Sequence, residues 1–169
     1  ELTAENLFTI QSEISTAIAD SLEATLSPEE QDRVFDLPTD NLEAYNHYLR
    51  ARQLMALRNK DDLEQAYEEF SRATEIGPDF ALAWVGVADV ANLLINIGAL
   101  DWDTDSDVRL EAAEKAVALN DQLGEAYTSL ASIYSDQGED EKAEAAYLKA
   151  IELNPNYAQA YQWYASSLG

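Results

Sequence analysis

The sequence DWDTDSD, which begins at Asp101, places an aspartate at every second position. The first three oxygen ligands of an EF-hand calcium loop have this spacing. A loop that began at Asp101 would need glycine at the position of Ser106 and glutamate at that of Ala112. A loop that began at Asp103 would need its glycine at Val108. Neither register supplies the glycine of the sharp turn, so the sequence predicts no calcium site here.

The acidic run is better interpreted as the end of a loop in front of a helix with the sequence SDVRLEAAEKAVAL. Asp105 or Ser106 would cap this helix, because a side-chain oxygen there accepts a hydrogen bond from a backbone N–H of the first turn. The neighbouring carboxylates would lie near the positive end of the helix dipole, which stabilises them. We therefore expect a capped loop.

Side chains that could perform catalysis are scarce. His47 is the only histidine, and the chain has no cysteine. A nucleophile needs a base beside it, and a zinc site needs several ligands. His47 lies between Tyr45 and Tyr48, where we expect a packed structural residue, and carboxylate pairs such as Glu68 and Glu69 are expected on solvated helix faces. With no phosphate-binding glycine loop either, the sequence predicts a protein that is not an enzyme and takes no cofactor and no metal.

The charge of the chain restricts its partners. It carries 33 acidic and 10 basic residues, which gives a formal net charge of -23. Such a charge repels nucleic acids and anionic lipid surfaces, and no basic patch opposes it. No apolar run reaches the ~20 residues that a membrane helix needs. Solubility is the favoured interpretation of this charge, and a basic protein partner is the alternative.

Self-similarity of the sequence indicates the architecture. The segment GEAYTSLASIYSDQGEDEKAEAAYLKAIELNPN, which begins at Gly124, resembles the 34-residue tetratricopeptide pattern. Looser copies in phase with it begin at Ala44, Ala81 and Ala158. These starts are separated by 37, 43 and 34 residues, so the first two repeats carry about three and nine extra residues between their two helices. The signature residues of the best copy are Tyr127, Leu130, Ala131, Tyr134, Ala143, Tyr147, Ala150 and Pro155.

The physical logic of such a repeat supports the pattern. Small residues at the eighth, twentieth and twenty-seventh repeat positions let two helices approach closely, and large residues fill the gaps between neighbours. A single helix pair cannot bury its apolar face, so pairs stack into a superhelix. The sequence thus predicts an all-α tetratricopeptide-repeat superhelix of three full repeats plus a terminal half repeat. We expect seven helices from Ala44 onward in antiparallel pairs, and no β-sheet within residues 44–169.

A helical lead-in, residues 1–40, is expected to precede the repeat domain, residues 41–169. Apolar residues at helical spacing predict an amphipathic helix near residues 5–25. The sequence SPEE then supplies an N-cap, a proline and a glutamate for a short second helix after Pro28. The chain begins without methionine or a hydrophobic signal core, which indicates a piece of a larger protein. The apolar residues of the first helix are Leu7, Ile10, Ile14, Ala17, Ile18 and Leu22.

In tetratricopeptide domains the first helix of each repeat lines a concave groove, with the second, fifth, sixth and ninth positions facing a ligand. Chaperone-binding members hold a peptide carboxylate there with cations, but Tyr48 and Thr128 replace such cations here and only Arg52 is basic. We therefore expect no such clamp. The candidate groove residues are Tyr45, Tyr48, Leu49, Arg52, Leu82, Val85, Gly86, Asp89, Glu125, Thr128, Ser129, Ser132, Gln159, Gln162 and Trp163.

Two interpretations of the groove stay open. In one, it binds a peptide or helix of a protein partner. In the other, Tyr45, Tyr48 and Leu49 receive the N-terminal helix of the same chain.

Phrases of the sequence resemble one particular family. LFTIQSEISTAIADSL followed by PTDNLEAYNHYLRARQLM, and NPNYAQAYQWYASSLG, are similar to the C-terminal region of bacterial multidomain signalling proteins. The resemblance implies an upstream effector, either a winged-helix DNA-binding domain or a class III nucleotide cyclase, followed by a domain that resembles the N-terminal part of TolB. Tyr161, where many relatives have histidine, and the acidic loop depart from the common pattern and leave the type of effector open.

The resemblance implies a non-catalytic interaction and scaffold module of a signalling or transcriptional regulator. The alternative is a structural spacer and self-association element of a cyclase-type protein. The compartment would be the bacterial cytoplasm, or the periplasm if a membrane span precedes this piece.

The last half repeat, AQAYQWYASSLG, has no second helix after it. Tyr161, Tyr164, Ala165 and Leu168 would pack on such a helix, so we expect them to form an exposed apolar patch. This patch predicts a weak two-fold homodimer through residues 158–169.

Overall fold

The computed structural model describes residues 38–100 and 102–167, with the backbone alone for 102–106, and five residues of the N-terminal segment. The rest of the predicted helix near residues 5–25, and the predicted short helix after Pro28, lie outside the described residues. The chain divides into two units, Glu1–Leu42 and Glu43–Gly169. The five described residues of the N-terminal segment, all helical, are Thr9, Ile10, Glu13, Ile14 and Ala17.

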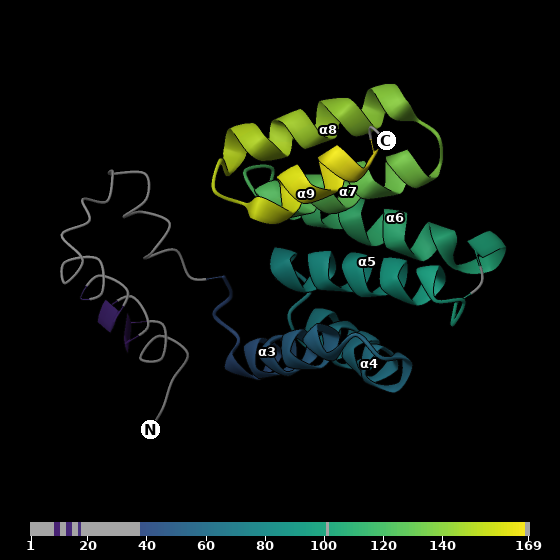
Figure 1. Ribbon diagram of the computed structural model, residues 1–169. Coiled ribbons are helices and arrows are strands. Elements are labelled where there is room, and N and C mark those ends of the chain that lie inside the picture. Colours follow the sequence, from purple (N-terminus) through teal and green to yellow (C-terminus); the bar gives the residue numbers. More distant parts are fainter. Residues whose placement is uncertain (1–8, 11–12, 15–16, 18–37, 101, 168–169) are drawn as a thin grey trace. The chain divides into compact units, whose positions relative to one another are not determined.

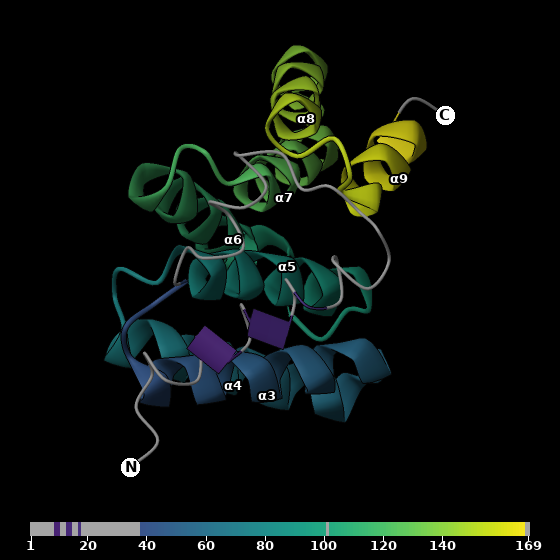
Figure 2. The same ribbon diagram turned by 90° about the vertical axis from the view of Figure 1, so that its left-hand side faces the viewer.

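The described part of the second unit consists of helices joined by short turns and holds no strand. Its seven helices confirm the prediction for the region from Ala44 onward. Successive helices lie antiparallel and stack as layers, with α3 and α4 at one end and α7, α8 and α9 at the other (Figures 1 and 2). The helices are α3 (Leu42–Leu57), α4 (Lys60–Ile76), α5 (Ala81–Asn96), α6 (Trp102–Leu119), α7 (Gly124–Asp136), α8 (Asp140–Leu153) and α9 (Ala158–Ser167).

Backbone hydrogen bonds repeat at the end of each second helix and fix the phase of the repeats. The N–H groups of Gly77, Asn120 and Asn154 donate to the carbonyls four residues earlier, at 2.9, 3.0 and 2.9 Å. The carbonyls of the same three residues accept from the N–H groups three residues later, at 3.0, 3.3 and 3.1 Å. These positions are 43 and 34 residues apart, which equals the spacing predicted for the last three repeat starts.

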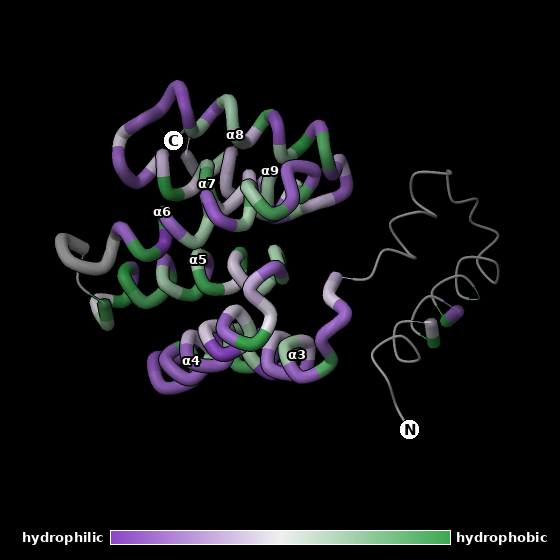
Figure 3. The backbone as a smooth tube through the Cα atoms, turned by 180° about the vertical axis from the view of Figure 1, so that it is seen from behind, coloured by the Kyte–Doolittle hydropathy of each residue, from purple (hydrophilic) through white to green (hydrophobic). Residues whose placement is uncertain are grey.

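Alanines form the closest contacts between the two helices of each pair. Ala51, Ala66 and Ala73 of the first repeat are fully buried, as are Ala131 and Ala150 of the third. Helix α5 lies between its neighbours on both sides and is apolar over most of its length, whereas α4 is largely polar (Figure 3). The small residues let the helices approach, and α5 contributes more buried residues than any other described helix.

Gly86 of α5 lies against the ring of Phe70 of α4, which is fully buried. A Cβ atom at Gly86 would fall within that ring, because Cε1, Cδ1 and Cζ of Phe70 occupy its place. Glycine is thus required here by the close approach of two helices, although glycine weakens a helix interior.

The nine extra residues of the second repeat mainly lengthen its helices, and this corrects the predicted loop. Helix α5 is three residues longer than α7, α6 is four residues longer than α8, and the connection gains only two. Helix α6 begins at Trp102, so the backbone is already helical at Asp105 and Ser106, which were expected to cap it. Aspartates within the first turns of a helix remain compatible with its dipole.

Candidate functional site

A cavity of about 260 Å³ opens on the face of the stack that α3, α5, α7 and α9 share. We call it the Asp89 cavity. It brings together residues from both ends of the repeat domain, because the superhelix curves α3 toward α9. Its lining residues are Tyr48, Arg52, Met55, Phe70, Leu82, Val85, Gly86, Asp89, Glu125, Tyr157 and Gln159.

Asp89 is a carboxylate on the apolar helix α5 and is only 9% exposed. Its Oδ1 accepts a hydrogen bond of 2.5 Å from the hydroxyl of Ser129 on α7. Burial raises the pKa of Asp89 to about 6, although hydrogen bonds from Ser129 and Gln159 and the charge of Arg58 oppose the shift. Near neutral pH the cavity therefore holds a largely ionised, poorly solvated carboxylate.

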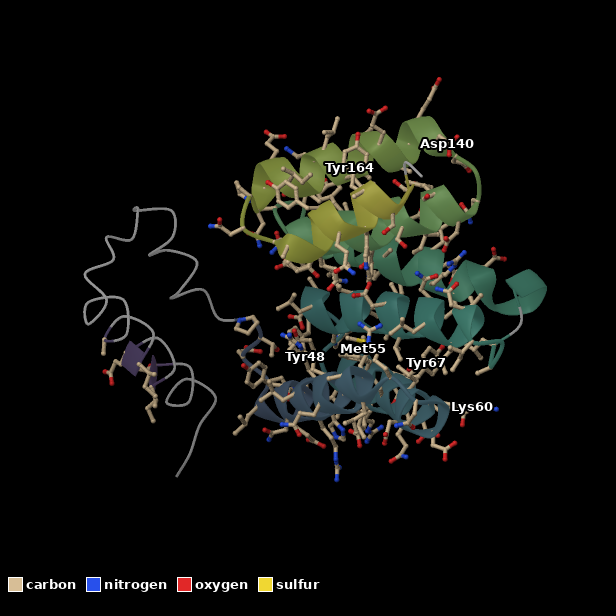
Figure 4. All side chains as sticks on the ribbon, in the orientation of Figure 1. Tyr48, Met55, Lys60, Tyr67, Asp140 and Tyr164 are labelled. Atoms are coloured by element: carbon tan, nitrogen blue, oxygen red, sulfur yellow. The ribbon has the colours of Figure 1, made fainter. Side chains whose placement is uncertain are left out.

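Tyr48 and Tyr45 were predicted to line the groove, but they pack mainly into the core. Both are more than 90% buried. The ring of Tyr48 lies 5.0 Å from that of Phe80 and 5.9 Å from that of Phe70, centroid to centroid, and Tyr45 lies 6.4 Å from Phe80. Tyr48 reaches the edge of the Asp89 cavity, whereas Tyr45 is absent from its lining. Figure 4 shows Tyr48 and Met55 between α3 and α5.

Arg52 lies one helical turn after Tyr48 at the rim of the cavity. Its guanidinium donates to the Tyr48 hydroxyl at 3.3 Å and lies 5.8 Å from the centre of that ring. Burial raises the pKa of Tyr48, so the phenol stays neutral and can accept this bond.

A second cavity of about 240 Å³ follows at the C-terminal ends of the same helices, and we call it the Trp163 cavity. Its lining is polar except for Leu93, Tyr147 and Trp163. The polar residues that line it are Arg58, Asn92, Asn96, Ser132, Ser135, Asp136, Ser166 and Ser167.

Hydrogen bonds between α5 and α7 form the floor under both cavities. One turn beyond the bond between Ser129 and Asp89, Asn92 Nδ2 donates to Ser132 Oγ at 3.3 Å. Asn92 Oδ1 accepts in turn from Arg109 of α6. Arg109 is fully buried, and its Nη1 also lies 2.6 Å from Asp136 Oδ2. Three helices are thus joined by polar contacts at the centre of the stack.

The structure divides the predicted groove residues into four groups, which are those of the Asp89 cavity, those of the Trp163 cavity, the buried Tyr45, Thr128 and Ser129 outside both linings, and the remaining Leu49 and Gln162. Several lie together in the Asp89 cavity, and Ser132 and Trp163 line the Trp163 cavity. Thr128 is a correction, since it is fully buried and its hydroxyl donates to the Gly124 carbonyl at 3.0 Å. Leu49 is half-buried and Gln162 exposed, and neither lines either cavity. The predicted residues of the Asp89 cavity are Tyr48, Arg52, Leu82, Val85, Gly86, Asp89, Glu125 and Gln159.

Glu69 corrects the expectation of a solvated carboxylate pair. Its side chain is 21% exposed, and Oε2 lies 2.5 Å from Nδ1 of His47. Its other oxygen accepts from Arg50 at 3.3 Å. His47 is thus a structural link between α3 and α4, which agrees with the packed role that was expected for it.

The sequence analysis missed Met55, Tyr157, Asn92 and Arg109. Tyr157 lies in the turn before α9, and only first-helix positions had been transferred from the repeat pattern. Arg109 had a usable signal. It lies eleven residues before Asn120, just as Ala66 and Ala143 lie eleven residues before the equivalent Gly77 and Asn154. An arginine therefore occupies a position where the other repeats have a small residue.

Family models agree with this geometry over the C-terminal part of the chain. Two tetratricopeptide repeat models match residues 124–157 and 146–169. No curated protein matches the sequence.

Solved structures extend the agreement to most of the chain. The first tetratricopeptide domain of Spaghetti (RPAP3), bound to an HSP90 peptide, is 16% identical with a TM-score of 0.60, over 78% of this chain and 95% of that one. The Sgt2 domain from Aspergillus fumigatus is 17% identical with a TM-score of 0.60, over 75% and 78%. The MamA protein is 18% identical with a TM-score of 0.56, over 97% and 80%. At these identities the likeness concerns the fold alone, which is a tetratricopeptide-repeat superhelix.

Within the described residues, no group of three or more potential metal ligands occurs, and no helix is long and apolar enough to cross a membrane.

Proposed function

We propose that this chain is a protein–protein interaction module that binds a peptide or helix of a partner in the groove along α3, α5, α7 and α9. The observation that carries the proposal is the pair of cavities on this one face. They lie in succession along the same helices and share a polar floor between α5 and α7. A succession of pockets along a continuous groove suits an extended or helical segment better than a compact ligand.

A structural relative supports this use of the fold, since the RPAP3 domain was solved with an HSP90 peptide, SRMEEVD. The chemistry of the present groove differs from what an acidic peptide needs. The lining of the Asp89 cavity pairs the carboxylates of Asp89 and Glu125 with the guanidinium of Arg52, and the Trp163 cavity pairs Asp136 with Arg58. We therefore do not extend the ligand of that relative to this chain.

A peptide library and one pair of variants test the proposal. Leu82 is half-buried on the groove side of α5, whereas Leu148 is 52% exposed on α8. Leu82→Ala should weaken the binding of selected peptides about fivefold or more, because apolar contact is lost. Leu148→Ala removes the same atoms elsewhere and should leave affinity unchanged. Equal effects of the two variants, with both proteins folded by circular dichroism, would contradict a groove site.

The larger protein is proposed to be a bacterial regulator with an upstream effector, either a winged-helix DNA-binding domain or a class III cyclase. Support comes from the family phrases at residues 7–22, 38–55 and 154–169. Sequencing upstream of this piece tests the proposal, since a chain without either effector would contradict it.

Self-association through residues 158–169 is the second candidate function. Tyr161 of α9 is 46% exposed, which favours it. Tyr164 does not, because it stacks on Tyr147 with ring centroids 5.2 Å apart and donates to Glu144 Oε1 at 3.0 Å. The patch predicted on α9 is therefore smaller than the sequence indicated.

A further inference from the structure

We propose that the Asp89 cavity binds a cationic side chain, a lysine ammonium or an arginine guanidinium, of the segment that the groove takes from its partner. The inference rests on the proposed function and adds the charge of the residue that the partner presents. Three features of the cavity carry it, which are a buried carboxylate, an excess of negative charge and aromatic walls.

The buried carboxylate is that of Asp89. It lines the cavity while more than nine-tenths buried, and a serine hydroxyl binds its Oδ1. A carboxylate offers about four lone-pair positions, so the bonds from Ser129 and Gln159 leave room for a further donor. No ion pair of Asp89 is found within the described part of the chain. Arg58 acts on Asp89 through its charge, but it lines the neighbouring Trp163 cavity and forms no ion pair with Asp89 within the described residues. Asp89 can therefore still pair with a cation that enters from the groove.

The charges that line the cavity favour a cation over an anion. Asp89 and Glu125 contribute two carboxylates, and Arg52 contributes one guanidinium, which leaves a net charge of -1. Arg52 is itself engaged with Tyr48. A partner carboxylate would be repelled by the two carboxylates of the cavity and by the formal charge of -23 on the whole chain. An ammonium or guanidinium would be attracted by both.

The walls and the size of the cavity suit a long basic side chain. Tyr48, Phe70 and Tyr157 line it, and aromatic faces attract cations within about 6 Å of the ring centre. Arg52 already uses the Tyr48 ring in this manner, at 5.8 Å. The volume of about 260 Å³ is below the roughly 300–1,000 Å³ of pockets for small-molecule ligands. A single side chain with an apolar stem and a charged end fits these features.

The electrostatic state of Asp89 agrees with a site that awaits a cation. Burial raises the pKa of Asp89 to about 6, and the charge of Glu125 acts in the same direction. Ser129 and Gln159 oppose the shift by hydrogen bonding and Arg58 by its charge. An ammonium in the cavity would reverse the shift, since an opposite charge favours the ionised carboxylate. Protonation of Asp89 should correspondingly weaken the binding of a basic segment.

Labelled peptide pools with one fixed central residue test the inference. Four pools share degenerate flanking positions and differ only at the centre, which is lysine, arginine, norleucine or glutamate. Affinities are measured by fluorescence polarisation for the wild type, Asp89→Asn and Asp79→Asn. The last variant removes one charge from an exposed turn and serves as the matched control. The lysine or arginine pool should bind the wild type about tenfold more tightly than the norleucine pool, as one charge-assisted hydrogen bond implies.

The outcomes separate the inference from the proposed function. Loss of the basic preference in Asp89→Asn, with the preference kept in Asp79→Asn, supports the inference. Equal binding of the basic and norleucine pools, or a preference for the glutamate pool, overturns the inference but does not contradict the groove function. No binding of any pool overturns both. Should Asp89→Asn fail to fold, the wild type is compared at about pH 7.5 and about pH 5, and an unchanged basic preference overturns the inference.

Discussion

At the scale of single residues, Asp89 combines the binding role that we propose for it with a cost to the stability of the fold. A carboxylate within an apolar helix is held by a serine hydroxyl and an amide, while its pKa rises to about 6 because burial disfavours the charge. Folding therefore prefers the protonated acid. Below about pH 4, where the group is protonated in both states, the penalty is absent, and above about pH 6 it is fully present.

Asp89→Asn should raise the free energy of unfolding at pH 7.5 by roughly 1–3 kcal/mol, because the amide keeps an acceptor for Ser129 and carries no charge. The gain should shrink toward pH 5, where the wild-type carboxyl is mostly protonated. Urea denaturation at both pH values measures it. A variant less stable than the wild type at pH 7.5 would contradict a destabilising charge at this position.

Residue roles could be predicted from the sequence only in part. The repeat pattern predicted Asp89, Leu82 and Gln159 on one face, since periodicity fixes which face of a helix a position occupies, and all three line the Asp89 cavity. It did not predict that Tyr48 is buried, because the repeat pattern does not show that the rings of Phe70 and Phe80 pack against it. It did not predict the burial of Thr128 either, whose hydroxyl donates to the Gly124 carbonyl.

At the scale of the elements, one contact between α4 and α5 sets how closely the first two repeats approach. Gly86 faces the ring of Phe70 with no space for a Cβ atom, and Phe70 is fully buried and cannot swing into solvent. The same glycine lies on the floor of the Asp89 cavity. Packing of the two helices and the volume of the site are thus coupled through a single position.

Gly86→Ala should destabilise the fold by up to about 2 kcal/mol, since overpacking costs about 1–3 kcal/mol and alanine returns about 1 in helix propensity. Phe70→Leu relieves the clash, so the double variant should be more stable than the sum of the single effects predicts. Chemical denaturation of the four proteins of this cycle measures the coupling. Strictly additive effects would show that the two residues do not compete for the same space.

Helix α6 gives an independent reason for the absence of a calcium loop. An EF-hand site needs a twelve-residue loop with a sharp turn, whereas the backbone is helical from Trp102 onward. Calcium should leave the melting temperature unchanged beyond the effect of ionic strength. The double variant Asp103→Asn/Asp105→Asn should respond to calcium in the same way as the wild type. A saturable rise in melting temperature that the double variant abolishes would contradict this.

Periodicity predicted the number and phase of the helices, because alanines and large residues recur at fixed positions in each repeat. It did not predict where the nine inserted residues of the second repeat would go. An insertion between two helices can extend either helix or the loop, and acidic residues suit both a loop and the first turn of a helix.

At the scale of the whole molecule, α9 carries an exposed tyrosine, Tyr161, on which the proposed self-association depends. If residues 158–169 associate, Tyr161→Glu should shift the protein toward monomer without loss of helicity, because Tyr161 is exposed whereas Tyr164 is packed on α8. Sedimentation at high micromolar concentration measures the state. A strictly monomeric wild type would contradict the association.

The central claim is that a partner segment binds along α3, α5, α7 and α9. The most direct measurement is the amide proton–nitrogen NMR spectrum of the labelled protein during titration with the tightest peptide from the pools. The largest shifts should fall at Leu82, Val85, Asp89 and Gln159, with little change at Leu148. Shifts confined to the outer faces of α4, α6 and α8, with those of the Asp89 cavity unmoved, would contradict it.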